Sequence, residues 1–245
     1  MNNHESVINK IKKLLSLAEG NQNEHERDVA MKFAMELLAK HNLTMETFDG
    51  QPAHDRIEEV HADFKLEPWI TTTLDAACNL YYTDFYIHRT VESTRFDYWT
   101  GRIVRKYRNT PVFFGRAENI AVTIDVATWL LNSVRSESNK LYRDAASRRS
   151  FRVGASDRLY VRADKLVQEE KATQEGAVGN ALVVLRNSLQ CANEEYLRSL
   201  HLETVKPRRS SVYQDAYAAG DEYGNSMSLA PGKTAPHTQL SITQR

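Results

Sequence analysis

The chain has 245 residues, enough for one large domain or two small ones, with hydrophobic (41%) and charged (26%) contents typical of a folded globular protein. No apolar run approaches the roughly 18 to 20 residues of a membrane span, and the N-terminus lacks the pattern of a secretory signal. Cys78 and Cys191 are far apart and form no CxxC, so neither a disulfide framework nor a structural zinc site is indicated. We therefore expect a cytoplasmic protein without a membrane partner.

The net charge of zero conceals a gradient along the chain. Residues 1–68 contain 8 Lys/Arg and 13 Asp/Glu, whereas residues 101–165 contain 14 Lys/Arg and 6 Asp/Glu. An acidic first quarter and a basic middle part can attract each other or attract separate partners. This asymmetry is the main electrostatic feature of the sequence.

The first 49 residues have the pattern of a helical hairpin. Residues 5–18 place apolar side chains on one stripe, with lysines off it, which is typical of an amphipathic helix. A second helix is predicted from Glu24, with acidic residues in its first turn and Asn42 at its end. The short polar loop between them predicts an antiparallel pair, residues 1–49.

Residues 50–67 lack a clear period and are predicted to form a linker. Pro68 fits the first turn of a helix that runs to about Tyr82. Three β-like runs follow at residues 84–91, 96–104 and 106–114, and a long helix is predicted over residues 117–145. This order, α-β-β-β-α, predicts a small antiparallel sheet flanked by helices.

Two more helices are predicted at residues 150–173 and 180–204, completing a domain over residues 68–205. The remainder, residues 206–245, is rich in Ser, Gly, Pro and Thr and is predicted to be a mostly flexible tail. The fold class predicted from these elements is α+β.

The N-terminal pattern resembles an uncharacterised family of phage and bacterial proteins that is catalogued as a domain of unknown function. Its KIxKLLxLA helix and KHNL ending are matched by Lys10, Ile11, Lys13, Leu14, Leu15, Leu17 and Ala18, and by Lys40, His41, Asn42 and Leu43. Weaker matches follow: an FxG junction at 113–115, an SFxxG element at 150–154, and an AYxxGxxxG segment at 216–224. The resemblance implies a role in infection, in the host bacterial cytoplasm, but no activity.

The Gly115-Arg116 junction has two interpretations. Backbone N–H groups at a helix start attract anions, and Arg116 could add a charge-assisted contact. A single glycine, however, forms neither GxGxxG nor GxxxxGK[ST], and Glu118 would itself occupy the positive end of the helix dipole. We favour a structural turn between a strand and a helix.

Catalytic motifs are absent from the sequence. The eight histidines form no HExxH or HxH, although His61 and Asp63 could meet Asp84 or His88 in space. GxSxG is also absent. A divalent-metal nuclease or hydrolase using Asp75, Asp84, Glu118 or Asp125 is kept as a third hypothesis. We expect no catalytic residue, metal or cofactor.

Arginines dominate the middle of the chain, interleaved with aromatic residues. Guanidinium groups suit phosphate oxygens, and nearby rings can stack on unpaired bases. The candidate nucleic-acid-binding residues are Arg102, Arg105, Lys106, Arg108, Arg116, Arg148, Arg149 and Arg152, and further arginines follow at 143, 158 and 162. Equally, these groups could pair with the acidic hairpin or with a second subunit, which leaves a homo-oligomer open.

The leading hypothesis is a non-enzymatic phage or prophage accessory protein that binds nucleic acid through these arginines, with strong salt dependence and little sequence preference. The alternative is an inhibitor or adaptor that binds a host protein, where the acidic hairpin imitates nucleic acid or docks a basic partner.

Overall fold

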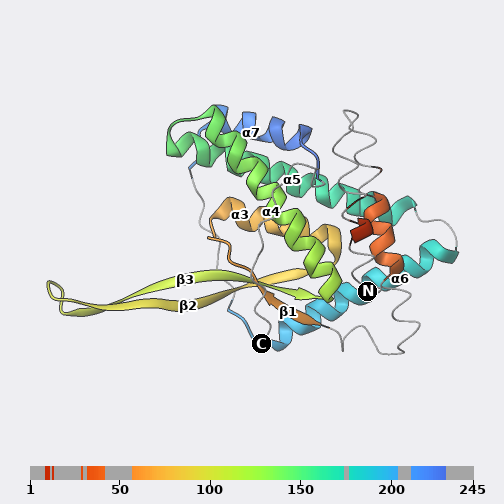
Figure 1. Ribbon diagram of the computed structural model, residues 1–245, viewed down its shortest axis with the longest axis horizontal. Helices are drawn as coiled ribbons and strands as arrows, with labels where there is room; N and C mark the ends of the chain where they lie inside the picture. Colours follow the sequence, from red (N-terminus) through yellow and green to blue (C-terminus); the bar gives the residue numbers. More distant parts are fainter. Residues whose placement is uncertain are drawn as a thin grey trace.

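The computed structural model describes residues 9–11, 13, 29, 32–41, 57–173, 177–203 and 211–229, without the side chains of residues 170–184. It has an α+β fold, as predicted (Figure 1). Most of the predicted N-terminal hairpin lies outside these residues, although residues 32–41 of its second helix are helical. The proposed domain boundaries remain predictions.

The sheet has the strand order β1-β3-β2, with both pairs antiparallel. Its strands are β1 (Glu58–His61), β2 (Asp84–Asp97) and β3 (Arg102–Gly115). The prediction of three strands between residues 84 and 114 was wrong, because that region forms two long strands. The third strand comes from the segment that was predicted to be a linker.

A proline explains part of that error. Asn109-Thr110-Pro111 has the composition of a turn, yet Pro111 lies within β3 opposite Ile87. Its carbonyl oxygen accepts a hydrogen bond from the Ala62 N–H at 3.1 Å, on the side where β1 has just ended. A residue's N–H and C=O point to the same side of a strand, so the missing donor removes no bond to β2.

Helices α3 (Pro68–Tyr81) and α4 (Ala117–Leu141) lie between the sheet and the outer helices (Figure 1). Pro68 starts α3 as predicted, and Tyr82 ends it in the left-handed conformation at φ 56°. The apolar stripes predicted from the sequence are buried, including Leu74 on α3 and Ile120 on α4. They form the main core together with Phe113 of β3.

Helices α5 (Ala145–Thr173) and α7 (Gln214–Ser226) pack closely side by side. The prediction of a flexible tail was wrong for α7. Gly154 of α5 lies against the Tyr217 backbone, and Gly220 of α7 against the Phe151 backbone, leaving no room for a Cβ atom at either glycine. The SFxxG and AYxxGxxxG segments therefore meet each other, and their glycines permit the close approach.

Helix α6 (Ala177–Ser199) lies at the base of the sheet, on the side away from α3 and α4 (Figure 1). Tyr196 of α6 packs on Phe114, with ring centroids 5.2 Å apart. Phe113, the neighbouring residue in β3, points the other way and packs on Phe64 and Phe85. This alternation anchors the root of the sheet between two helical layers.

Candidate nucleic-acid interface

The β2–β3 ribbon extends far beyond the helical body (Figure 1). We call residues 87–109 the β arm. All of them are exposed except the partly buried Asp97. Nine residue steps separate His88 from Asp97, so the arm reaches about 30 Å from its base. The whole arm, residues 87–109, contains six Lys/Arg and two Asp/Glu residues.

The end of the arm is a four-residue loop, Tyr98 to Gly101, fixed by its own hydrogen bonds. Gly101 adopts φ +63°, a conformation that favours glycine. The Asp97 carboxylate accepts the Trp99 N–H at 3.0 Å. Hydrogen bonds from the Thr100 side chain and the Trp99 backbone lower the pKa of Asp97, which keeps this carboxylate charged. The tip is therefore held by local contacts, and none of the described contacts joins it to the body.

The cross-strand register assigns the arm's side chains to two faces. Directly opposed residues share a face, and successive residues alternate. One face, which we call the cationic face, carries Arg95, Arg102, Lys106 and Arg108. The other, the aromatic face, carries Arg89, Phe96, Ile103, Arg105 and Tyr107. The Arg89 guanidinium stacks 3.7 Å over the centre of the Tyr107 ring, in agreement with this assignment.

Two of the arm's six cations are engaged by carboxylates. Lys106 pairs with Glu92 at 2.7 Å, and Arg108 donates a hydrogen bond to Asp63. All four side chains of these pairs are substantially exposed, so each pair contributes little to stability and can exchange for an outside anion. Among the described residues, Arg95, Arg102 and Arg105 have no ion-pair partner. The arm thus keeps part of its positive charge available.

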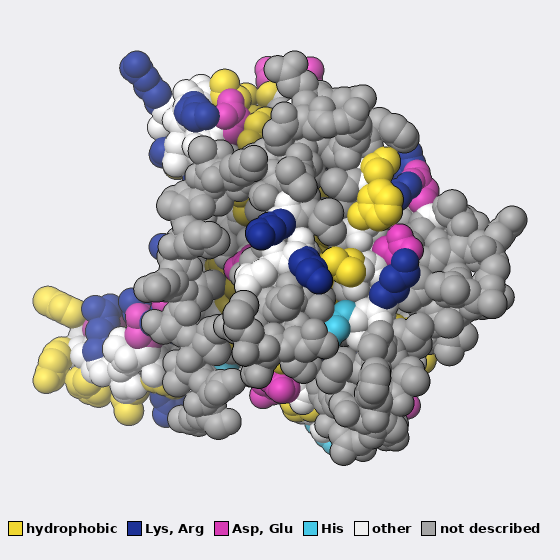
Figure 2. All heavy atoms as spheres, turned by 45° about the vertical axis from the view of Figure 1, so that its right-hand side comes forward, with side chains coloured by type: hydrophobic (Ala, Val, Ile, Leu, Met, Phe, Trp, Pro, Cys, Tyr) yellow, Lys and Arg dark blue, Asp and Glu magenta, His cyan; other side chains and the backbone are white. Residues whose placement is uncertain are grey.

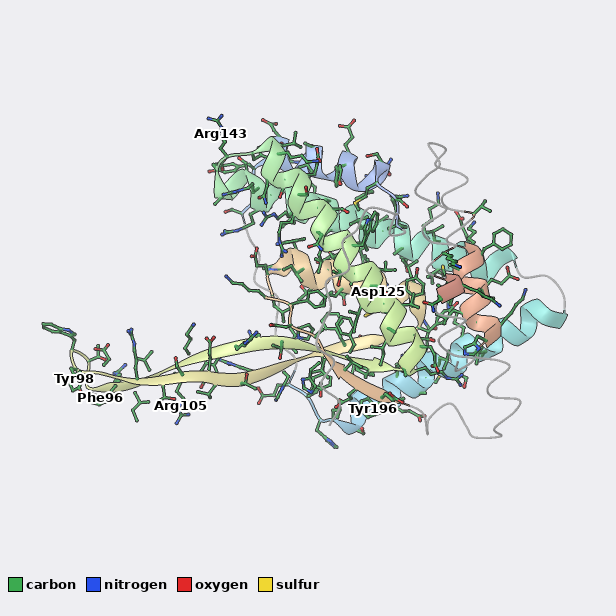
Figure 3. All side chains as sticks on the ribbon, viewed as in Figure 1. Phe96, Tyr98, Arg105, Asp125, Arg143 and Tyr196 are labelled. Atoms are coloured by element: carbon green, nitrogen blue, oxygen red, sulfur yellow. The ribbon has the colours of Figure 1, made fainter. Side chains whose placement is uncertain are left out.

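The remaining predicted arginines lie elsewhere. Arg143 projects from the turn between α4 and α5, away from the arm (Figure 3), and Arg148 and Arg149 follow at the start of α5. Arg152 is partly buried, donates to Ser138 Oγ at 2.8 Å and lies over the Trp69 ring. It therefore serves packing between helices rather than an open surface.

Two further arginines hold α7 in place. Arg158 forms two hydrogen bonds with the Asp221 carboxylate, at 2.9 and 2.6 Å. Arg162 donates to the carbonyl oxygens of Gly224 and Met227 at 2.9 and 2.6 Å, near the C-terminal end of α7. Both arginines are therefore engaged within the molecule, by α7 and not by the acidic hairpin named in the sequence-based alternative.

Arg116 is only 5% exposed, so its prediction as part of an open basic surface was wrong. It is the residue that precedes the first turn of α4, with Glu118 in that turn. Gly115 adopts φ +142°, and a Cβ there would lie 3.3 Å from Thr83 Cγ2. These features support a tight strand-to-helix turn at this junction.

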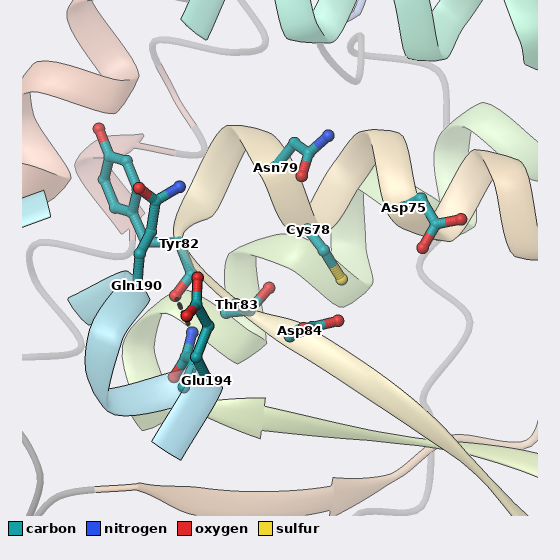
Figure 4. Close-up of a pocket in the computed structure, with 9 residues that line it drawn as sticks. Asp75, Cys78, Asn79, Tyr82, Thr83, Asp84, Gln190 and Glu194 are labelled. Atoms are coloured by element: carbon teal, nitrogen blue, oxygen red, sulfur yellow. Dashed lines mark hydrogen bonds between the residues drawn. The ribbon is translucent and has the colours of Figure 1, made fainter. Parts of the chain in front are cut away.

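A polar pocket of about 220 Å³ lies where α3, the start of β2 and α6 meet (Figure 4). It brings together two residues of the third hypothesis, Asp75 and Asp84, and adds Glu194 from α6. Partial exclusion of water and the nearby Asp84 charge raise the pKa of Asp75 to about 6, although its side chain remains accessible at the opening. Burial also raises the pKa of Asp84.

The carboxylates of the pocket are not arranged as a metal centre. Glu118 and Asp125 of the third hypothesis do not line it. Searching the described part of the chain finds no group of three His, Cys, Asp or Glu side chains arranged to hold a metal ion. His61 and His88 do meet at the arm's base, with ring centroids 5.7 Å apart, but they belong to no such group.

Sequence reasoning missed the arm and its tip. Residues 96–104 were interpreted as one strand, which hid Tyr98 and Trp99 in a β run. In the structure their side chains are 87% and 99% exposed. The signal was Asp97 and Gly101 bracketing three residues between two alternating runs, a pattern typical of a hairpin loop.

These features define an α+β protein with a projecting, partly cationic β ribbon. A family model described as "Protein of unknown function (DUF2786)" matches residues 6–45. This supports the uncharacterised family recognised from the N-terminal motif, over that segment of the chain. No curated protein and no solved structure matches. In the described parts of the chain, no helix has both the length and the apolar character needed to cross a bilayer.

Proposed function

We propose that this protein binds nucleic acid without breaking bonds, by laying its β arm along a DNA duplex. One observation carries the proposal: an exposed ribbon about 30 Å long that holds six Lys/Arg against two Asp/Glu. The major groove of B-form DNA admits a two-stranded β ribbon, and one helical turn spans about 34 Å. A phage or prophage setting in the bacterial cytoplasm is a further part of the proposal and comes from the family resemblance.

The arrangement of charge favours contact with phosphates over base-specific recognition. Arg95, Arg102 and Lys106 point to one side of the ribbon, next to short polar residues such as Ser93. Arg102 and Arg105 alternate in direction, so cations face both walls of a groove. Contacts of this kind position a protein on DNA and carry little sequence information, so we expect weak sequence preference.

Salt titration tests the proposal. The affinity for a labelled duplex of about two helical turns would be measured by fluorescence anisotropy across several salt concentrations. Each phosphate contact adds about 0.9 to the steepness of log affinity against log salt. The double variant Arg102→Ala with Arg105→Ala should reduce that slope by about 2 and weaken binding to all duplex sequences alike.

A matched control removes two cations at distant sites. Lys165→Ala with Arg198→Ala deletes the same charge from exposed positions on α5 and α6, and should leave the slope unchanged. A third pair, Arg143→Ala with Arg149→Ala, reports whether the α4–α5 turn makes a separate contact. Affinity that stays flat as salt rises, or equal effects of the arm and control pairs, would refute the proposal.

The second candidate, an adaptor for a host protein, is favoured by the exposure of Tyr98 and Trp99, since such residues are common at protein-binding hot spots. Affinity purification from the host distinguishes the two. A stoichiometric protein partner that survives nuclease treatment, and is lost when Trp99 is changed to Ala, would favour the adaptor.

A further inference from the structure

We infer that the tip of the arm stacks on unpaired bases, so that the protein prefers sites where single-stranded DNA adjoins a duplex. This inference rests on the proposed function and specifies the kind of DNA that the arm recognises. The tip is defined by Phe96, Tyr98 and Trp99, whose side chains are 51%, 87% and 99% exposed. Figure 2 shows hydrophobic side chains gathered at the end of the projecting part, with Lys and Arg behind them.

The tip is an ordered aromatic surface. Phe96 and Tyr98 contact each other edge to face, with ring centroids 5.1 Å apart (Figure 3). The Asp97 carboxylate fixes the Trp99 backbone, and Gly101 closes the loop. Holding these rings in water is unfavourable, and the described helical body does not cover them. A loop with restricted backbone loses less freedom when its rings meet a flat partner.

Charge next to the tip selects the partner. Arg102 directly follows the loop, and Arg95 directly precedes Phe96 on β2. Neither has an ion-pair partner in the described structure, and both lie on the cationic face beside the loop that carries Tyr98 and Trp99. Arg105 lies on the aromatic face with Phe96. A base that stacks on a ring has its phosphate a short distance away, where these guanidinium groups can reach it. An apolar protein surface would use the rings and leave this pairing unused.

The type of side chain favours unpaired bases over insertion into an intact duplex. Bases within a duplex are already stacked, and inserting a wedge between them requires unstacking. Proteins that kink DNA often use apolar wedges such as Phe, Leu, Ile, Met or Pro. Tyr98 and Trp99 instead offer broad rings that suit the open face of an unpaired base, which needs no unstacking.

Competition between three DNAs tests the inference. The probes are a blunt duplex, the same duplex with a single-stranded overhang, and the overhang strand alone. We expect the wild-type chain to bind the overhang DNA about tenfold more tightly than the blunt duplex. Tyr98→Ala with Trp99→Ala should abolish this preference and leave blunt-duplex affinity and its salt slope unchanged. Tyr98→Phe with Trp99→Phe, which keeps two rings, should retain it.

Tryptophan fluorescence gives a second readout that does not depend on affinity. The chain has three tryptophans, and Trp99 is fully exposed whereas Trp69 is buried. Acrylamide quenching of wild-type emission should fall when overhang DNA binds, and Trp99→Phe should remove that change. Protection of Trp99 by the blunt duplex to the same extent would count against the inference.

The outcomes separate this inference from the proposed function. Duplex binding that depends on Arg102 and Arg105 but shows no overhang preference overturns the inference and leaves the function standing. A preference that survives the double alanine variant also overturns it. Absence of binding to all three DNAs at low salt overturns both. The inference is supported if Tyr98→Ala with Trp99→Ala loses the overhang preference while Tyr98→Phe with Trp99→Phe keeps it. The melting temperature of both variants must equal that of the wild type.

Discussion

Replacing Gly220 with alanine tests whether the α5–α7 contact depends on backbone approach. A Cβ at residue 220 would lie closer than 3.0 Å to the Phe151 backbone oxygen, whereas ordinary van der Waals contact begins at about 3.4 Å. The obstructing atom belongs to the main chain of α5, so it cannot move aside as the end of a flexible side chain would. Helix α7 must shift outward instead.

An outward shift weakens the other contacts that fix α7. These include the hydrogen bonds from Arg162 to the Gly224 and Met227 carbonyl oxygens and the burial of Met227. Overpacking of this kind costs about 1 to 3 kcal/mol, and more when backbone must move. Alanine favours a helix over glycine by about 0.5 to 1 kcal/mol, in the opposite direction. We expect a net loss of about 2 kcal/mol in the free energy of unfolding.

Circular dichroism during heating measures this loss. For a chain of this size, 1 kcal/mol shifts the melting temperature by about 2 to 4 °C, so a decrease of about 6 °C is expected. Limited proteolysis should show earlier cleavage near α7. Ala218→Ser, at an exposed position of the same helix, serves as the control and should change little. A Gly220→Ala protein that melts at or above the wild-type temperature would refute the close-approach argument.

Two further predictions concern the pocket and the arm's base. The pKa of Asp75 is raised from 3.8 to about 6, so the folded state favours the protonated carboxyl. The contribution of this group to the stability of the fold is present below pH 4 and is lost as the pH rises through 6. Asp84, Glu194 and Cys78 line the same pocket, and none of its described lining residues is a cation. Asp75→Asn should therefore be more stable than wild type at pH 8, by on the order of 1 kcal/mol because the carboxylate meets solvent, with a smaller difference at pH 4. Urea unfolding at both pH values checks this, and equal differences would contradict it. Arg108→Ala should leave the melting temperature unchanged, because its pair with Asp63 is exposed, while reducing the salt slope of DNA binding by about 1. A large drop in melting temperature would show that this pair supports the arm.

The arm's root explains how an exposed ribbon can keep its direction. Val112, Phe113 and Phe114 are fully buried, and they form the last buried stretch before β3 ends at Gly115. Phe113 contacts the helical core and Phe114 contacts α6. Beyond Thr110 the described contacts of the ribbon are its own cross-strand pairing and the exposed pair between Arg108 and Asp63. The arm is thus anchored by buried residues at its base and depends on its own cross-strand pairing toward the tip.

Local patterns determined the helices of this protein. Pro68 and the apolar stripe behind it set the start and buried side of α3, and the spacing of Ile120, Ala127 and Leu131 did the same for α4. Burial of an apolar stripe is the main source of stability for both, so the period in the sequence is enough to find them. The basic character of the middle region was likewise legible from residue identity alone.

Only the tertiary structure decided which charges remain available. Arg102 and Arg158 are alike in sequence, yet Arg102 stands on an open ribbon and Arg158 meets Asp221, which is 63 residues away along the chain. Pairings over such separations depend on how helices dock, and no local period encodes them. Strand length was also undetermined, because β pairing outside the core is set by the partner strand and the loop between them. The sequence therefore specified the main helices, while long-range pairing and packing determined the strands, helix α7 and which side chains became surface.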